Sequence, residues 1–137
     1  MFEKKIAWPK YQLIAKRIKV FSFEEIKTPH ALHNGHKQKI KLSLEKDGLL
    51  NPPVIEQKTM ECVSGNHSFQ ILRKKKEHTH IICYQAFNDD ECKFLSLINK
   101  HVWESFKKGQ EIRDFEFMFN DPKIFALVEK CKTLIQP

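Results

Sequence analysis

Residues 62–73 contain the side chains whose types and order point most directly to chemistry. An apolar run ends at Gly65, and Asn66 and His67 then open a stretch with helical spacing. A helix that begins there would direct backbone N–H groups, an amide and an imidazole toward one point, where its partial positive charge would favour phosphate. We therefore expect a phosphate- or nucleotide-binding loop, the alternative being a tight turn without a ligand. The loop consists of Ser64, Gly65, Asn66, His67 and Ser68.

His67 and Asn66 are the candidate catalytic residues of this loop. Imidazole titrates near neutral pH, so it can donate a proton to a phosphoryl oxygen or take one from water. Asn66 would orient the reacting group through a hydrogen bond. The same sequence is compatible with a structural role, in which His67 only closes the loop by hydrogen bonding.

No set of metal ligands is evident near the loop. Glu56 and Glu61 are the nearest carboxylates, and they do not form a dedicated pair. Three histidines, His30, His33 and His36, have a three-residue spacing that would place them on one face of a helix. However, Asn34-Gly35 is expected to interrupt that helix, which disfavours a metal site there. The metal ligands are therefore unknown, and Mg²⁺ or Mn²⁺ delivered together with a DNA phosphate stays open as a cofactor.

The elements that must position the loop follow from apolar periodicity and turn residues. The pattern predicts strands over residues 18–23, 54–55, 60–64 and 79–86, and helices over residues 36–47, 67–77, 89–108 and 122–134. Gly48 ends the first helix, because glycine readily adopts the left-handed conformation found after a helix C-terminus. Ile40, Leu42 and Leu44 are expected to contact the core from that helix. Asp89 and Asp90 are expected to cap the third helix.

These elements predict an α+β fold, in which helices flank a small mixed sheet. We expect residues 1–17 to form an N-terminal arm and residues 18–108 to form the domain itself. Residues 109–137 are expected to form a helical C-terminal extension that packs on the same domain. At 137 residues the chain is long enough for one hydrophobic core.

The order of the elements resembles the ParB/sulfiredoxin superfamily over residues 18–106. The resemblance depends on two motifs and on their spacing. The first is the segment Gly-Leu-Leu-Asn-Pro-Pro at residues 48–53, between a helix and a strand, and the second is Ser64-Gly65-Asn66-His67. In phage and plasmid proteins described as ParB-like nucleases, the loop reads Gly-Asn-His-Arg. Here Ser68 stands in place of the arginine, which removes a bidentate phosphate donor.

The resemblance also bears on which activities are expected. Sulfiredoxin has a catalytic cysteine where this chain has Asn66, so reduction of sulfinic acids is not expected. Partition ParB proteins bind CTP phosphates with Gly-Glu-Arg-Arg and Glu-Asn-x-x-Arg, of which only Gly65 and Asn99 remain here. By similarity to sulfiredoxin, Lys39 and Ser43 fall near positions that contact ATP phosphates. Binding of ATP or CTP is therefore an alternative function.

The positive charge of the chain is concentrated in its first third. Residues 1–50 hold eleven Lys and Arg against five Asp and Glu, while the whole chain has a formal net charge of +7. Such an excess favours binding to a phosphate backbone, although lysine also serves solubility. The expected DNA contacts come from Lys37, Lys39, Lys41, Arg73, Lys74, Lys75 and Lys76.

Composition limits the remaining possibilities. No apolar run approaches the ~20 residues that span a bilayer, and the N-terminus has no signal-peptide core, so we expect a cytoplasmic protein without a membrane partner. The four cysteines form no close pair, which disfavours a zinc ribbon and favours free thiols. The apolar and aromatic C-terminal third offers a surface for a homodimer, which the sequence leaves open.

The leading hypothesis is a non-specific DNA-binding protein of the ParB-like nuclease type, encoded by a phage or mobile element and able to hydrolyse phosphodiester bonds. One alternative is a non-catalytic module that binds DNA or protein on the same fold. The other is a regulator that binds ATP or CTP.

Overall fold

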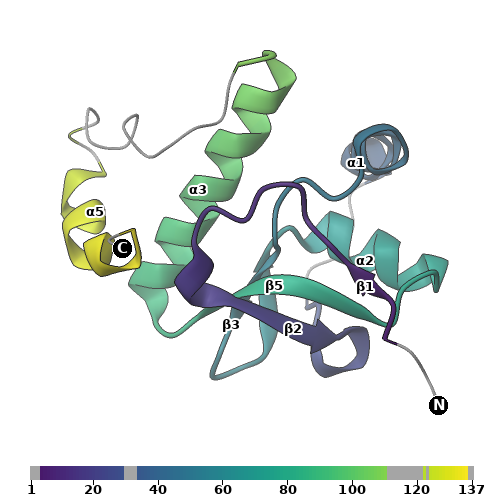
Figure 1. The fold of residues 1–137 in the computed structure, drawn as a ribbon, viewed down its shortest axis with the longest axis horizontal. Coiled ribbons are helices and arrows are strands. Elements are labelled where there is room, and N and C mark those ends of the chain that lie inside the picture. Colours follow the sequence, from purple (N-terminus) through teal and green to yellow (C-terminus); the bar gives the residue numbers. More distant parts are fainter. Residues whose placement is uncertain (1–3, 30–33, 111–121, 123, 136–137) are drawn as a thin grey trace.

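The centre of the molecule is a five-stranded mixed sheet, shown in Figure 1 in a computed structural model that describes residues 4–29, 34–110, 122 and 124–135. The strands are β1 (Ile6–Ala7), β2 (Ile18–Ser22), β3 (Val54–Glu56), β4 (Glu61–Ser64) and β5 (His80–Ala86). β5 pairs in parallel with β1 and β3 and antiparallel with β2, and β3 pairs antiparallel with β4. The sheet is therefore mixed, as expected.

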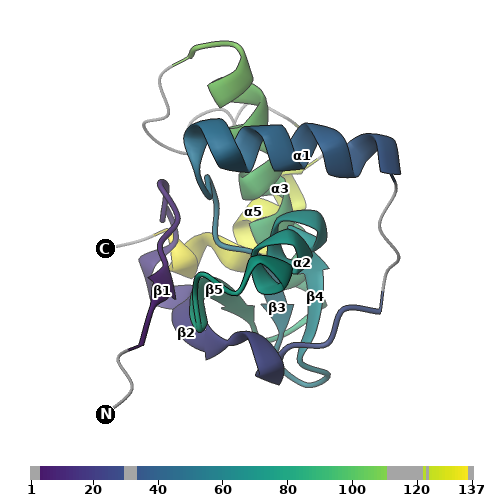
Figure 2. The same cartoon turned by 90° about the vertical axis from the view of Figure 1, so that its right-hand side faces the viewer.

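Helices cover both faces of this sheet (Figure 2). They are α1 (Asn34–Asp47), α2 (Asn66–Lys75), α3 (Asp89–Lys107) and α5 (Phe125–Cys131), with 3₁₀ turns η1 (Ala15–Arg17), η2 (Phe23–Glu25) and η3 (Lys132–Leu134). The α+β fold expected from the sequence is confirmed. None of the described helices is long and apolar enough to cross a membrane.

β5 separates two hydrophobic clusters because its side chains alternate between the faces of the sheet. Ile81 and Cys83 belong to the cluster that includes Phe69 of α2. Tyr84 points to the opposite cluster, which includes Phe94 of α3. Four consecutive residues of β5, from Ile81 to Tyr84, are buried, as is typical of a strand covered on both faces.

Residues 4–17, which belong to the expected N-terminal arm, take part in the sheet and core. Ile6 and Ala7 pair with β5, and the Tyr11 N–H donates to the Leu50 carbonyl at 2.8 Å. Ile14 is fully buried, and its N–H donates to the Tyr84 hydroxyl at 3.2 Å. The apolar residues of this segment follow no regular spacing, because individual residues contact the core and no single helix or strand makes all the contacts.

Two local expectations on the helices are wrong. α1 begins at Asn34, two residues before the expected start, and His30 and His33 lie outside the described part of the chain. Leu42 is 64% exposed, although Ile40 is buried, because residues two apart on a helix point in different directions. α3 is capped by Asn88, whose side chain accepts from the Glu91 N–H at 2.9 Å, so the aspartates after it occupy the first turn instead.

Candidate phosphate site

The loop between β4 and α2 has the geometry that the sequence predicts. β4 ends at Ser64, Gly65 has φ +78° and ψ +22°, and α2 begins at Asn66. This left-handed conformation costs little for glycine and more for any residue with a Cβ. Gly65 therefore turns the chain sharply and directs the first turn of α2 back over the end of the sheet.

A cavity of about 220 Å³ opens beside this turn. Its wall is made by α1, the segment before β3, the β4–α2 loop and α3. The wall is mainly apolar, but serine hydroxyls reach it from three helices and from the loop. The polar lining residues are Ser43, Asn51, Ser64, Ser68, Ser96, Asn99 and Lys100. We call this space the loop cavity.

The loop cavity brings together only part of the set predicted from sequence. Ser64, Gly65 and Ser68 line it, and so does Ser43 from α1. Asn66 and His67 are half-buried and are not among its lining residues. Asn66 instead uses its side-chain oxygen to accept a hydrogen bond from Gln70 Nε2 at 3.0 Å.

Asn99 is the buried polar residue of the loop cavity. Its side chain is 7% exposed, and its Nδ2 donates to the Pro52 carbonyl at 2.7 Å. The main-chain carbonyl of Asn99 accepts a hydrogen bond from Asn51 Nδ2 at 3.1 Å. Among the described residues, Asn99 Oδ1 has no hydrogen-bond partner. A buried acceptor without a donor is costly, and this oxygen is shielded from solvent beside the cavity rather than exposed in it.

Asn99, Lys100 and Trp103 were missing from the predicted site, although the sequence contains a signal for them. Ser96 and these three residues stand at positions i, i+3, i+4 and i+7, which is one face of a helix. The apolar stripe through Leu95, Ile98 and Val102 is buried on the neighbouring face. This polar and aromatic stripe lies beside the core stripe and lines the loop cavity.

A second hollow, of about 550 Å³, lies between α1 and the last turns of α3. We call it the α1–α3 groove. Ser43 and Trp103 line both the groove and the loop cavity, so the two spaces are neighbours. The other residues of the groove are Lys39, Leu42, Lys46, Asp47, Phe106 and Lys107. Lys39 therefore belongs to the groove and not to the loop cavity.

The α1–α3 groove combines ammonium groups with aromatic rings. Lys107 Nζ lies 4.6 Å from the centre of the Trp103 ring. At the other ring, Lys10 Nζ lies 5.1 Å from the centre of Phe106. Tyr11 packs edge-on against Phe106, with 6.5 Å between the ring centres. Cation–π contacts of this kind keep a positive charge beside an aromatic face.

The predicted DNA-contacting residues lie on α1 and at the end of α2. Lys39, Lys41, Lys74, Lys75 and Lys76 are exposed, while Lys37 is half-buried. Arg73 differs from them because its Nη2 donates to Thr28 Oγ1 at 2.9 Å and its guanidinium lies over Phe69. Arg73 therefore connects α2 to the segment before α1, in addition to any contact with a ligand.

None of the four cysteines lines the loop cavity. Cys62 lies on β4 and is fully buried, and burial raises the pKa of its thiol to about 12. Cys83 and Cys131 are also buried, and all four cysteines are free. Within the described part of the chain, no group of three or more His, Cys, Asp and Glu side chains is arranged to hold a metal ion.

Comparison with protein-family models and with curated proteins finds no match. Among solved structures, the chain is similar to two that are described as pNOB8-like ParB N-domains, with 14% and 16% sequence identity and TM-scores of 0.38 and 0.40. The alignments cover 69% and 64% of this chain but 49% and 33% of the ParB chains, so this chain spans half of their length or less.

Proposed function

We propose that this protein binds DNA through contacts to its phosphate groups. The contacts come from the α1–α2 basic surface, which we define as Lys37, Lys39, Lys41, Lys46, Lys74, Lys75 and Lys76. The observation that carries the proposal is that no ion pair within the described part of the chain neutralises these ammonium groups. None of them forms an ion pair within 4.0 Å with a carboxylate of the described residues. α1 and α2 pack against each other, so their charges act on the same ligand.

Binding of this kind is expected to depend little on base sequence. Lysine ammonium groups neutralise phosphates and release the counterions condensed on DNA, which supplies affinity without reading the bases. Sequence reading in the major groove needs side chains placed on a helix or ribbon that enters it. The lysines of the basic surface are long and flexible, and they match the phosphate backbone rather than base edges.

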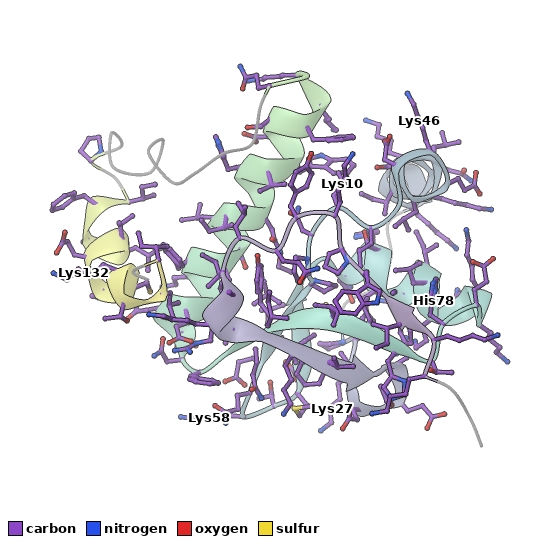
Figure 3. All side chains as sticks on the ribbon, viewed as in Figure 1. Lys10, Lys27, Lys46, Lys58, His78 and Lys132 are labelled. Atoms are coloured by element: carbon purple, nitrogen blue, oxygen red, sulfur yellow. The ribbon has the colours of Figure 1, made fainter. Side chains whose placement is uncertain are left out.

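The test compares two triple variants of equal charge by fluorescence polarisation with a labelled oligonucleotide. The first replaces Lys74, Lys75 and Lys76 with glutamine. The control replaces Lys58, Lys130 and Lys132 with glutamine; Lys130 lies on α5, and Lys58 and Lys132 lie away from Lys46 of α1 (Figure 3). We expect the first variant to lose at least about tenfold in affinity and the control to lose little. Equal losses would show that only net charge matters, and absence of binding by the unmodified protein would refute the proposal.

We further propose that the protein cleaves the DNA strand that it binds. His67 is the second residue of α2, and an imidazole is a side chain suited to proton transfer in phosphodiester cleavage. Mg²⁺ or Mn²⁺ bound to the DNA phosphate would stabilise the developing charge. The test is incubation of the protein with supercoiled plasmid, with and without either ion. Unaltered plasmid in all conditions would leave a non-catalytic DNA-binding module.

Nucleotide binding in the loop cavity is the second candidate function. It is favoured by the position of the α2 N-terminus, Lys100 and several serine hydroxyls around one space. ATP or CTP with Mg²⁺ would be titrated into the protein and followed by calorimetry. Saturable binding that is lost in Lys100→Gln and retained in the control Lys93→Gln supports this function. Heat equal to that of dilution, for both nucleotides, refutes it.

A further inference from the structure

We infer that the DNA strand bound by this protein is single-stranded, and that an unpaired base stacks on Trp103 in the α1–α3 groove. The inference rests on the proposed DNA binding and names the form of DNA that fits. It starts from the combination of aromatic rings and lysines in one hollow, which the basic surface alone does not require. Trp103 and Phe106 supply the rings, and Lys39, Lys46 and Lys107 supply the charges.

This combination matches the two chemical parts of a nucleotide in a single strand. Proteins that bind single strands align a positively charged groove with the backbone and stack bases on aromatic side chains. In the α1–α3 groove, Lys39 and Lys46 come from one wall and Lys107 from the other. Ammonium groups on both walls favour a phosphate chain running between them, and Asp47 is the one carboxylate among the groove residues.

Trp103 is one of the two residues, with Ser43, that join the groove to the loop cavity. Its side chain is half-buried and lines both spaces, and Lys107 lies over its ring at 4.6 Å. A base therefore stacks on the other face of the indole or displaces this ammonium group, and in both cases Lys107 is close to the phosphates of the strand. Leu42, which is 64% exposed on the α1 wall, adds apolar surface for the same base.

The loop cavity offers a second contact for the same strand. Its volume of about 220 Å³ is several times the ~30 Å³ that one water molecule occupies, so a group larger than water fits. Ser43, Ser68 and Lys100 in its wall can form hydrogen bonds with the Watson–Crick edge of an unpaired base, whereas a duplex has already used these edges in base pairs.

A duplex does not fit these features without disruption. Its bases are stacked inside the helix, so a base can reach an indole in a groove only after it is flipped out at a cost of a few kcal/mol. The phosphates of a duplex can still contact the α1–α2 basic surface. We therefore expect duplex DNA to bind more weakly than a single strand and without involvement of Trp103.

The experiment uses Trp8→Phe as the parent protein, because the chain contains two tryptophans and Trp8 is 62% exposed outside the groove. Trp103 is then the sole tryptophan, and its fluorescence reports on stacking. A single-stranded 12-mer of mixed sequence and its duplex are titrated at equal salt. We expect the single strand to quench the fluorescence and to bind about tenfold more tightly than the duplex. Trp103→Leu, followed by polarisation, should lose about tenfold in single-strand affinity and keep its duplex affinity.

The outcomes separate this inference from the function on which it rests. Failure to bind either form of DNA would refute the proposed function itself. Equal binding of both forms, with no quenching and no effect of Trp103→Leu, would refute only the single-strand inference. A thermal melt checks the variant. If Trp103→Leu does not fold, the conservative Trp103→Phe replaces it, and it should retain part of the single-strand affinity because it retains a ring.

Discussion

Gly65 and Pro53 are in such close contact that a methyl group on Gly65 would lie 3.1 Å from Pro53 Cα. The contact joins the two motifs of the sequence, the Pro-Pro entry to β3 and the turn between β4 and α2. The atom that limits the space belongs to the backbone, so it cannot rotate away as the end of a flexible side chain can. The β4–α2 loop is thereby held at a defined distance from the segment that leads into β3.

Gly65→Ala is expected to destabilise the protein more than Gly48→Ala. Both glycines have a positive φ, +78° and +76°, so each substitution strains the backbone by about 1 kcal/mol. A Cβ at Gly48 meets nothing within 4 Å, whereas at Gly65 it meets Pro53. Overpacking adds about 1–3 kcal/mol at Gly65 only. Urea unfolding of the two variants measures the difference, and equal losses would mean that the contact with Pro53 relaxes freely.

The ion pair between Arg17 and Glu91 should make stability depend on pH. The two groups are 2.7 Å apart and largely buried. Burial raises the pKa of Glu91, but hydrogen bonds from Arg17 and from the Phe87 N–H, together with the charge of Arg17, lower it by more. The folded pKa therefore lies below the ordinary value of 4.5. The stabilisation is complete above that value and is lost as the pH falls through the folded pKa.

Glu91→Ala tests this dependence. We expect a loss of about 2 kcal/mol at pH 7, between the values typical of exposed and of fully buried pairs. The difference from the unmodified protein should shrink below pH 4.5, as the carboxyl group becomes protonated. Asp90→Ala is the control, because Asp90 forms an exposed pair with Lys130 at 3.8 Å and should cost less than about 1 kcal/mol. A difference that stays constant from pH 7 to pH 3 would contradict the assignment.

The salt dependence of DNA binding should decrease when cations of the basic surface are removed. Each phosphate contact contributes a log–log slope of about −0.7 for a single strand and about −0.9 for a duplex. Replacing Lys74, Lys75 and Lys76 with glutamine should therefore make the slope shallower by about 2 to 3, if all three contact phosphate. The slope is obtained from titrations at several salt concentrations. A slope unchanged by the triple substitution would show that these lysines point away from the bound strand.

His67→Ala separates catalysis from binding. If His67 transfers a proton during cleavage, this variant should lose plasmid cleavage while keeping its melting temperature and most of its DNA affinity, because one imidazole is a small part of a surface with many lysines. Asn66→Ala should reduce cleavage less, since an orienting hydrogen bond is typically worth about 1 kcal/mol. Cleavage at the normal rate by His67→Ala would assign the histidine a structural role.

The sequence was sufficient for much of the local structure around the loop. Gly48 after α1, Gly65 before α2 and the Pro-Pro pair before β3 act through backbone conformations that are set by the residue itself. The buried run in β5 and the apolar stripe of α3 follow from periodicity. These features depend on neighbours in sequence, so they could be predicted without knowing the tertiary contacts.

The residues that line the candidate site could not be predicted in the same way. Asn99 and Trp103 reach the loop cavity only because α3 packs beside the β4–α2 loop, and Leu42 is exposed because α1 contacts the rest of the molecule through Ile40 and Leu44. Contacts between elements far apart in the chain arise from packing, which periodicity does not specify. The sequence thus determined the fold class and the loop by itself. Only the tertiary structure decided which side chains share the cavity and the groove, because that depends on how the elements meet.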